Sequence, residues 1–356
     1  MTKRLVTLLS LGLVLCLLAG CVGTPVVYNC TEDHNTTAPT ETTLDSTAEP
    51  TVGEEGALKT GLAITCSLAK SENASLADYD VTLVAVLVDE EGIIRDCIID
   101  GIATKASFDA TGAVTSDPAA PISTKNELGE AYGMVAWGGA KYEWNEQAAA
   151  LAAFAVGKTV EELRNGAVNE QGRAPEGTDL ATMATIYLGG YVSAIEAAVA
   201  NAKHLGAQSG DTLKLAACPS MEAASAEAEK NGSAQLTVDA TALTEKDGII
   251  TSCLIDSLQA KVEFDATGTI TTDLTAPLLT KNQLGENYGM VAWGGAIAEW
   301  DAQAASFAAY VCGKTADEVG GIAVNEKTAP AEADLASSVT IAIGGFMALV
   351  QKALAA

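Results

Sequence analysis

Few side chains in this chain have the type and spacing that catalysis requires. The sequence contains only two histidines, His34 and His204, and neither falls in a segment that recurs elsewhere in the chain. No serine or cysteine lies in the strand–turn–helix pattern of an activated nucleophile. Carboxylates are so abundant, 46 Asp and Glu in all, that two of them close together in the sequence do not indicate an acid–base catalytic pair. We therefore predict no catalytic residue and no metal site, and we expect a carrier or binding protein rather than an enzyme.

Two threonines, Thr185 and Thr340, remain as candidates for chemistry. They lie in the segments "DLATMATIYLGG", which begins at Asp179, and "DLASSVTIAIGG", which begins at Asp334. A hydroxyl can form a phosphoester, and the start of a helix offers unpaired N–H groups and the positive end of its dipole to a phosphate. An alternative is that residues 339–343 form a plain edge strand, because their apolar side chains alternate, and that the helix begins only after the two glycines that follow.

Both segments belong to a tandem duplication. From Ile93 to about Gly172 the chain aligns with itself without a gap, so that Tyr132 falls on Tyr288. The nine residues "YGMVAWGGA" that begin at these tyrosines are identical in the two copies. Two copies of a unit of about 150 residues are typical of two globular domains, because a solenoid needs shorter and more numerous units.

Each copy begins with strand-like segments that the turn signals ending in Gly92 and Gly248 divide into hairpins. A helix with one apolar face is predicted next. Its spaced apolar residues are Trp144, Ala148, Leu151 and Ala155 in the first copy, and Trp300, Ala304, Phe307 and Val311 in the second. We therefore predict an α+β fold of two tandem copies of a small antiparallel sheet packed by helices, with the repeats at residues 57–205 and 206–356.

The "GKT" that follows this helix in each copy is not a phosphate-binding loop. The P-loop pattern requires a glycine five residues before its last glycine, and Ala152 stands there in the first copy. Instead, Thr159 with Glu162 predicts a capping box at the start of the next helix, and the pattern recurs from Thr315.

The cysteines also recur as pairs, Cys66 with Cys97 in the first copy and Cys218 with Cys253 in the second. Their spacing does not match a zinc site. Two alternatives stay open, since a protein outside the membrane can form a cross-strand disulfide in each copy or keep buried free thiols.

The segments that contain Thr185 and Thr340 resemble the FMN-binding domain family, whose members carry the pattern D-x-x-S-G-A-T before a final helix. The resemblance extends to the preceding hairpins and helix, and so covers most of each copy. It implies that FMN is joined to Thr185 and Thr340 through a phosphoester by a dedicated flavin transferase, which recognises Asp179 and Asp334 among other residues. The matching residues are Asp179, Thr182, Ala184 and Thr185 in the first copy, and Asp334, Ser337 and Thr340 in the second.

The chain departs from this pattern at two positions. The glycine of the pattern is Met183 in one copy and Ser338 in the other, and its alanine is Val339 in the second copy. If that glycine is needed for a positive φ or for close approach of the transferase, the threonines would stay unmodified. The alternative is therefore a domain that kept the fold without the cofactor.

The identical nine residues contain aromatic side chains that could stack on the isoalloxazine ring or another flat ligand. These are Tyr132 and Trp137 in the first copy, and Tyr288 and Trp293 in the second. Alternatively, the stretch fills the open end of the sheet as part of the core. A role in ligand binding requires the two tryptophans to be exposed near the threonines.

The beginning of the chain predicts export and lipid anchoring. Residues 1–20 form a lipoprotein signal peptide, with Lys3 and Arg4 ahead of an apolar run that ends in "LAGC", and Cys21 is the predicted lipidated residue. Residues 21–56 are rich in Thr, Pro and Glu, and we expect a disordered linker. The formal net charge of −26 argues against nucleic acid as a partner.

These observations together predict a lipoprotein anchored on the extracytoplasmic face of the cell membrane. It would carry FMN, bound covalently through threonine, and exchange electrons with redox partner proteins. The alternative is a non-catalytic surface lipoprotein whose duplicated domain binds a ligand or a protein partner without flavin.

Overall fold

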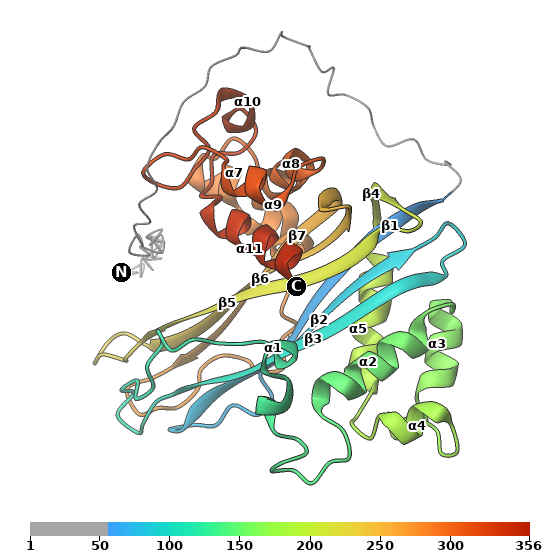
Figure 1. Cartoon of the computed structure of the whole chain (residues 1–356). Helices are drawn as coiled ribbons and strands as arrows, with labels where there is room; N and C mark the ends of the chain where they lie inside the picture. Colours follow the sequence, from blue (N-terminus) through green and yellow to red (C-terminus); the bar gives the residue numbers. More distant parts are fainter. Residues whose placement is uncertain (1–55) are drawn as a thin grey trace, which may run out of the picture. The chain divides into compact units, whose positions relative to one another are not determined.

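A computed structural model describes residues 56–356, in which two antiparallel sheets are packed with helices (Figure 1). This is the predicted α+β class. The predicted signal peptide, Cys21 and the linker up to residue 55 lie outside the described residues. Within residues 56–356, no helix has the length and apolar character needed to span a membrane.

The first sheet has four strands in the order β3-β2-β1-β4. They are β1 (Ala57–Ser67), β2 (Leu76–Val88), β3 (Ile94–Ser107) and β4 (Lys203–Gln208). The predicted turn between β2 and β3 is present, and Gly92 in it has a φ of 80°. β4 follows the last helix of the first copy and pairs with β1, so the predicted boundary between residues 205 and 206 falls inside this strand.

The second sheet has three strands in the order β5-β6-β7. They are β5 (Thr212–Ala224), β6 (Gly232–Lys246) and β7 (Ile249–Phe264). The strand residues alternate between the two faces of each sheet, as the period of two requires. In β2, for example, Val81 and Leu83 face the other sheet, whereas Val84 and Val86 face the helices.

Helices cover the outer face of each sheet, and the two inner faces pack on each other (Figure 1). The predicted amphipathic helices are confirmed as α2 and α8, and the capping boxes before α3 and α9 are formed. In the first copy the helices are α1 (Lys125–Leu128), η1 (Gly129–Tyr132), α2 (Trp144–Ala155), α3 (Val160–Ala167), α4 (Asp179–Met183) and α5 (Gly189–Ala200). In the second they are α6 (Lys281–Leu284), η2 (Gly285–Tyr288), α7 (Met290–Gly294), α8 (Trp300–Val311), α9 (Ala316–Gly320), α10 (Ala333–Ala336) and α11 (Gly344–Ala355).

The core between the sheets is built from both copies. The rings of Phe108 and Phe264, which are equivalent residues of the two copies, stack with their centroids 3.9 Å apart and their planes 2° from parallel. The Tyr79 hydroxyl donates a hydrogen bond to the carbonyl oxygen of Ala234, 2.8 Å away. Because these side chains are buried by residues of the other copy, the stability of each copy depends on its partner in the chain.

The two identical "FDATG" turns pack against the other copy in a reciprocal manner. Ala74 donates its N–H to the carbonyl oxygen of Gly268 at 2.7 Å, and Ala226 donates to that of Gly112 at 2.8 Å. A Cβ atom at Gly112 or Gly268 would approach a backbone oxygen of the other copy to 2.7 Å or 2.4 Å. The glycine of this turn is therefore required in both copies by the contact between them.

The cysteine pairs form no disulfide, and the cysteines that the structure describes are free thiols. Cys66 is paired with Val81 of β2, and Cys97 is paired with Val86 of the same strand, so β2 lies between the two cysteines. The cross-strand disulfide alternative is wrong for this reason. Burial raises the pKa of the Cys97 thiol to about 12, which makes it unreactive near neutral pH.

Candidate functional site

Thr185 and Thr340 lie on exposed, irregular backbone between a short helix and the last helix of each copy. The edge-strand alternative for residues 339–343 is wrong, because these residues are not in a strand and α11 begins at Gly344 itself. Neither Met183 nor Ser338 has a positive φ. The glycine of the family pattern is thus not needed here for its backbone conformation.

A buried glutamine holds each threonine. The Oε1 atom of Gln147 accepts hydrogen bonds from the N–H of Thr185 at 2.8 Å and from its hydroxyl at 3.2 Å. In the second copy, Gln303 accepts from the N–H of Thr340 at 2.8 Å and from its hydroxyl at 3.2 Å. Both glutamines are at most 1% exposed. One amide oxygen therefore orients the backbone and the hydroxyl of the candidate residue.

The same glutamine also holds the end of the glycine-rich loop. Gln147 Nε2 donates to the carbonyl oxygen of Tyr142 at 2.9 Å, and Gln303 Nε2 donates to that of Ala298 at 2.7 Å. Loop and threonine thus meet on one side-chain amide in each copy. No sequence motif points to these glutamines, although a polar residue kept on the buried face of the amphipathic helix in both copies is a usable signal.

A carboxylate fixes the beginning of the loop. Glu143 accepts the N–H of Met134 at 2.8 Å and of Val135 at 3.0 Å, and Glu299 makes the equivalent bonds in the second copy. Gly133 before them has a φ of 82°. A Cβ atom there would lie 2.4 Å from the ring of Trp137, so the glycine also lets the indole lie against the backbone.

The tryptophans at the loop tips are almost fully exposed, Trp137 at 89% and Trp293 at 92%. In contrast, Tyr132 and Met134 are partly buried and pack against the helical core. The two interpretations of "YGMVAWGGA" therefore apply to different residues. Its first residues belong to the core, and its tryptophan is available to a ligand.

A lysine lies under the loop tyrosine in each copy. Lys125 Nζ is 5.5 Å from the ring centroid of Tyr132 and 5.0 Å from that of Trp144, and it donates to Asp80 at 3.1 Å. Burial alone lowers the pKa of Lys125, but neighbouring groups, Asp80 among them, raise it above its usual value. Burial lowers the pKa of the equivalent Lys281. These cation–π contacts give the tyrosine of the repeat a structural role.

Asp179 and Thr182 lie on α4, and Asp334 lies on α10, whose C-cap is Ser337. Both aspartates are exposed. The hydroxyl of Thr182 donates to the carbonyl oxygen of Asp179 at 2.7 Å, and that of Ser337 donates to the carbonyl oxygen of Asp334 at 2.6 Å. The first hydroxyl thus bonds within α4, and the second bonds back to α10 from its C-cap. The aspartates remain accessible for recognition by another protein.

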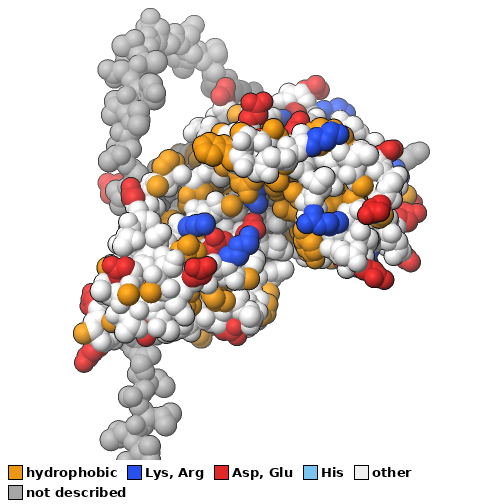
Figure 2. Space-filling model, turned by 90° about the horizontal axis from the view of Figure 1, so that it is seen from below, with side chains coloured by type: hydrophobic (Ala, Val, Ile, Leu, Met, Phe, Trp, Pro, Cys, Tyr) orange, Lys and Arg blue, Asp and Glu red, His pale blue; other side chains and the backbone are white. Residues whose placement is uncertain are grey.

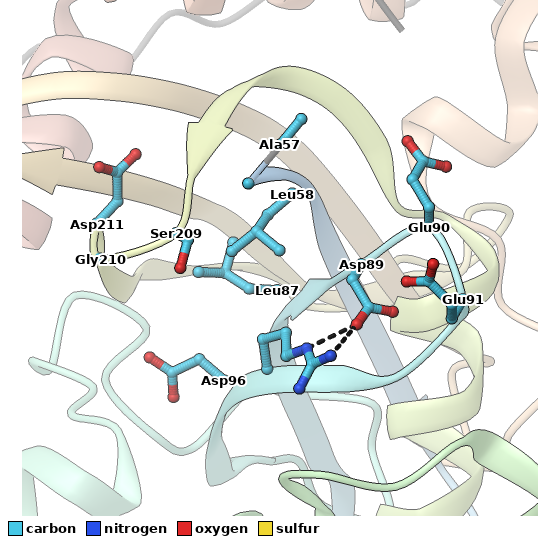
Figure 3. Close-up of a pocket in the computed structure, with 12 residues that line it drawn as sticks. Ala57, Leu58, Leu87, Asp89, Glu90, Glu91, Asp96, Ser209, Gly210 and Asp211 are labelled. Atoms are coloured by element: carbon cyan, nitrogen blue, oxygen red, sulfur yellow. Dashed lines mark hydrogen bonds and ion pairs between the residues drawn. The ribbon is translucent and has the colours of Figure 1, made fainter. Parts of the chain in front are cut away.

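One pocket, of about 610 Å³, lies at the start of β1 and the turn between β2 and β3 (Figure 3). Leu58 and Leu87 line it together with several carboxylates, and the guanidinium of Arg95 is engaged by Asp89 at 2.6 Å. No predicted cofactor residue lines this pocket. Among residues 56–356 no group of side chains is arranged to hold a metal ion.

A second pocket, of about 420 Å³, lies between β3 and α2 and is lined by Asn145 but not by Gln147. Asn145 and Gln147 are two positions apart in α2, which separates their side chains by about 200° around the helix axis. Gln147 and the threonine that it holds therefore lie on a different side of α2 from this pocket. A group attached to Thr185 would therefore lie on the surface. The surroundings fit this, because the Thr185 side chain is exposed and a Cβ atom at Gly190 would meet nothing within 4 Å.

The face of the molecule in Figure 2 shows hydrophobic patches interrupted by single acidic and basic side chains. Such a mixture does not concentrate charge of one sign on this face.

Comparisons with known protein families, with curated proteins and with solved structures find no match. The similarity to the FMN-binding domain family therefore depends on the residues quoted above.

Proposed function

We propose that the protein carries FMN as a phosphoester on threonine and serves as an electron carrier, anchored through Cys21 on the extracytoplasmic face of the membrane. One observation carries the proposal. In both copies a buried glutamine accepts a hydrogen bond from an exposed threonine hydroxyl, and the same amide holds the end of the loop whose tip is an exposed tryptophan.

The exposure of the threonine and of the loop tryptophan supports a surface-bound flavin. Attached to Thr185, the flavin would supply reversible electron transfer, while the protein supplies the attachment point and contacts for the ring. Trp137 offers an indole that is open to the solvent, and stacking of aromatic rings is favourable. Because neither pocket includes the threonine, the ring would stay accessible to redox partner proteins.

The test is production in a host that makes a flavin transferase. We expect the denatured protein to fluoresce in a gel and to be heavier by FMN, and we expect Thr185→Val with Thr340→Val to abolish both signals. Thr275→Val is the matched control, because Thr275 is an exposed threonine in a turn of the second copy and lies outside the family pattern. Loss of flavin in the control, or its retention in the double variant, would contradict the proposal.

A second candidate function is the binding of a flat ligand or a protein without flavin. The two exposed tryptophans favour it, since large aromatic side chains at the surface are typical of binding sites. Met183 and Ser338 at the glycine of the pattern are consistent with loss of attachment. This function predicts an unmodified mass in the same host and a binding activity that Trp137→Ala and Trp293→Ala remove.

A further inference from the structure

The guanidinium of Arg173 lies beside Thr185 in the first copy, where its Nη1 atom donates to the Thr185 carbonyl oxygen. The turn before it fixes its position, because Asn169 Oδ1 accepts the N–H of Arg173 at 3.1 Å. The same turn is bonded to the start of α5, since the carbonyl oxygen of Gly172 accepts the N–H of Leu188 at 2.7 Å. A cation therefore contacts the backbone of the candidate threonine.

Arg173 differs from the other arginines of residues 56–356 in its partners. Arg95 is paired with Asp89, and Arg164 is paired with Glu196 at 2.8 Å. No ion pair between Arg173 and a carboxylate is found within that range, although the whole chain has a formal net charge of −26. Its charge is thus not neutralised by a salt bridge, and a guanidinium binds phosphate oxygens well through two parallel N–H groups.

The second copy has the same turn, but Ala329 stands at the position of Arg173, and the cation of this turn is Lys327 at the position of Gln171. Asn325 Oδ1 accepts the N–H of Ala329 at 3.2 Å, as Asn169 does for Arg173. The carbonyl oxygen of Thr328 accepts the N–H of Ile343 at 2.8 Å, so this turn too is bonded to the start of the last helix. Residues 206–356 contain no arginine. The backbone of the turn is therefore equivalent, and the guanidinium bonded to the threonine carbonyl oxygen is present in the first copy alone among residues 56–356.

We infer that the first copy is the preferred acceptor of the flavin phosphate and that Arg173 is the residue that positions this phosphate at Thr185. The inference rests on the proposed function. In the attachment step the Thr185 oxygen bonds to the flavin-bearing phosphorus of a flavin dinucleotide, and the phosphoanhydride bond breaks. A nucleoside monophosphate leaves, and the hydroxyl proton passes to the solvent. The Arg173 charge stabilises the phosphate oxygens before and after this step.

In the experiment, the full chain is incubated with a flavin transferase and a flavin dinucleotide. The fraction of each threonine that carries flavin is measured over time from the masses of the peptides that contain it. We expect attachment at Thr185 to be roughly tenfold faster than at Thr340, as one charge-assisted hydrogen bond allows. Arg173→Ala should remove this advantage, and Arg173→Lys should restore most of it.

Arg173→Gln separates charge from structure, because its amide can still donate to the Thr185 carbonyl oxygen. We expect it to behave as Arg173→Ala does, whereas a role confined to holding the backbone predicts attachment at the original rate. Arg164→Gln is the control for a lost arginine elsewhere in the copy and should change nothing. Equal rates at the two threonines would overturn the inference and leave the proposed function standing. No attachment at either threonine would overturn the proposed function itself.

Discussion

Replacing Gly112 or Gly268 with alanine tests the contact between the two copies. A Cβ atom at Gly112 would lie 2.6 Å from the Cβ of Ala226, and one at Gly268 would lie 2.4 Å from the carbonyl oxygen of Asp109. Both glycines also have a positive φ, 68° and 72°. The conformation alone costs an alanine about 1–2 kcal/mol, and the overlap adds about 1–3 kcal/mol. We therefore expect each variant to lose about 2–5 kcal/mol of unfolding free energy.

Gly92 and Gly248 are the matched controls, because their φ values are 80° and 79° and an added Cβ would meet nothing within 4 Å. Their alanine variants should lose only the conformational part, about 1–2 kcal/mol. The assay is urea unfolding, with the free energy taken from the midpoint at constant slope. If all four variants lose the same free energy, the "FDATG" turns do not pack on the other copy as described.

Three further predictions concern the core, the loop and a buried charge. Phe108→Ala and Phe264→Ala should each cost about 3–5 kcal/mol of unfolding free energy. The double variant should cost less than the sum of the two, because the rings stack on each other. Additive costs in urea unfolding would contradict this coupling. Trp137→Ala and Trp293→Ala should change stability by less than about 0.5 kcal/mol, since both side chains are exposed, and a thermal melt checks it. Burial lowers the pKa of Lys281 in the folded state below 10.5. The charged Lys281 ammonium therefore destabilises the fold at neutral pH. This destabilisation disappears as the pH rises from the lowered pKa toward 10.5, because Lys281 is then neutral in both the folded and the unfolded state. The stability of the wild type relative to Lys281→Met should therefore increase between neutral and alkaline pH in urea unfolding, and a decrease would refute the cause given.

Local signals predicted the elements of the fold well. The hairpin turn at Gly92 and the capping box at Thr159 depend on neighbouring residues, and both are present as expected. The apolar face that begins at Trp144 placed α2 correctly. Each of these features is decided within a few residues of sequence, which is why one sequence was sufficient.

Features that depend on distant residues were not predictable in the same way. The stacking of Phe108 on Phe264 joins two copies that the sequence presents as separate units. Nothing in the spacing of Cys66 and Cys97 indicates that a strand lies between them. The role of Gln147 became visible only when the helix, the loop and Thr185 were brought together.

The intact mass of the protein tests the central claim most directly. The protein is produced in a host whose flavin transferase modifies a known acceptor in the same cells. We predict a mass higher by at least one FMN that Thr185→Val together with Thr340→Val removes, and an unmodified mass beside a modified acceptor would contradict the claim.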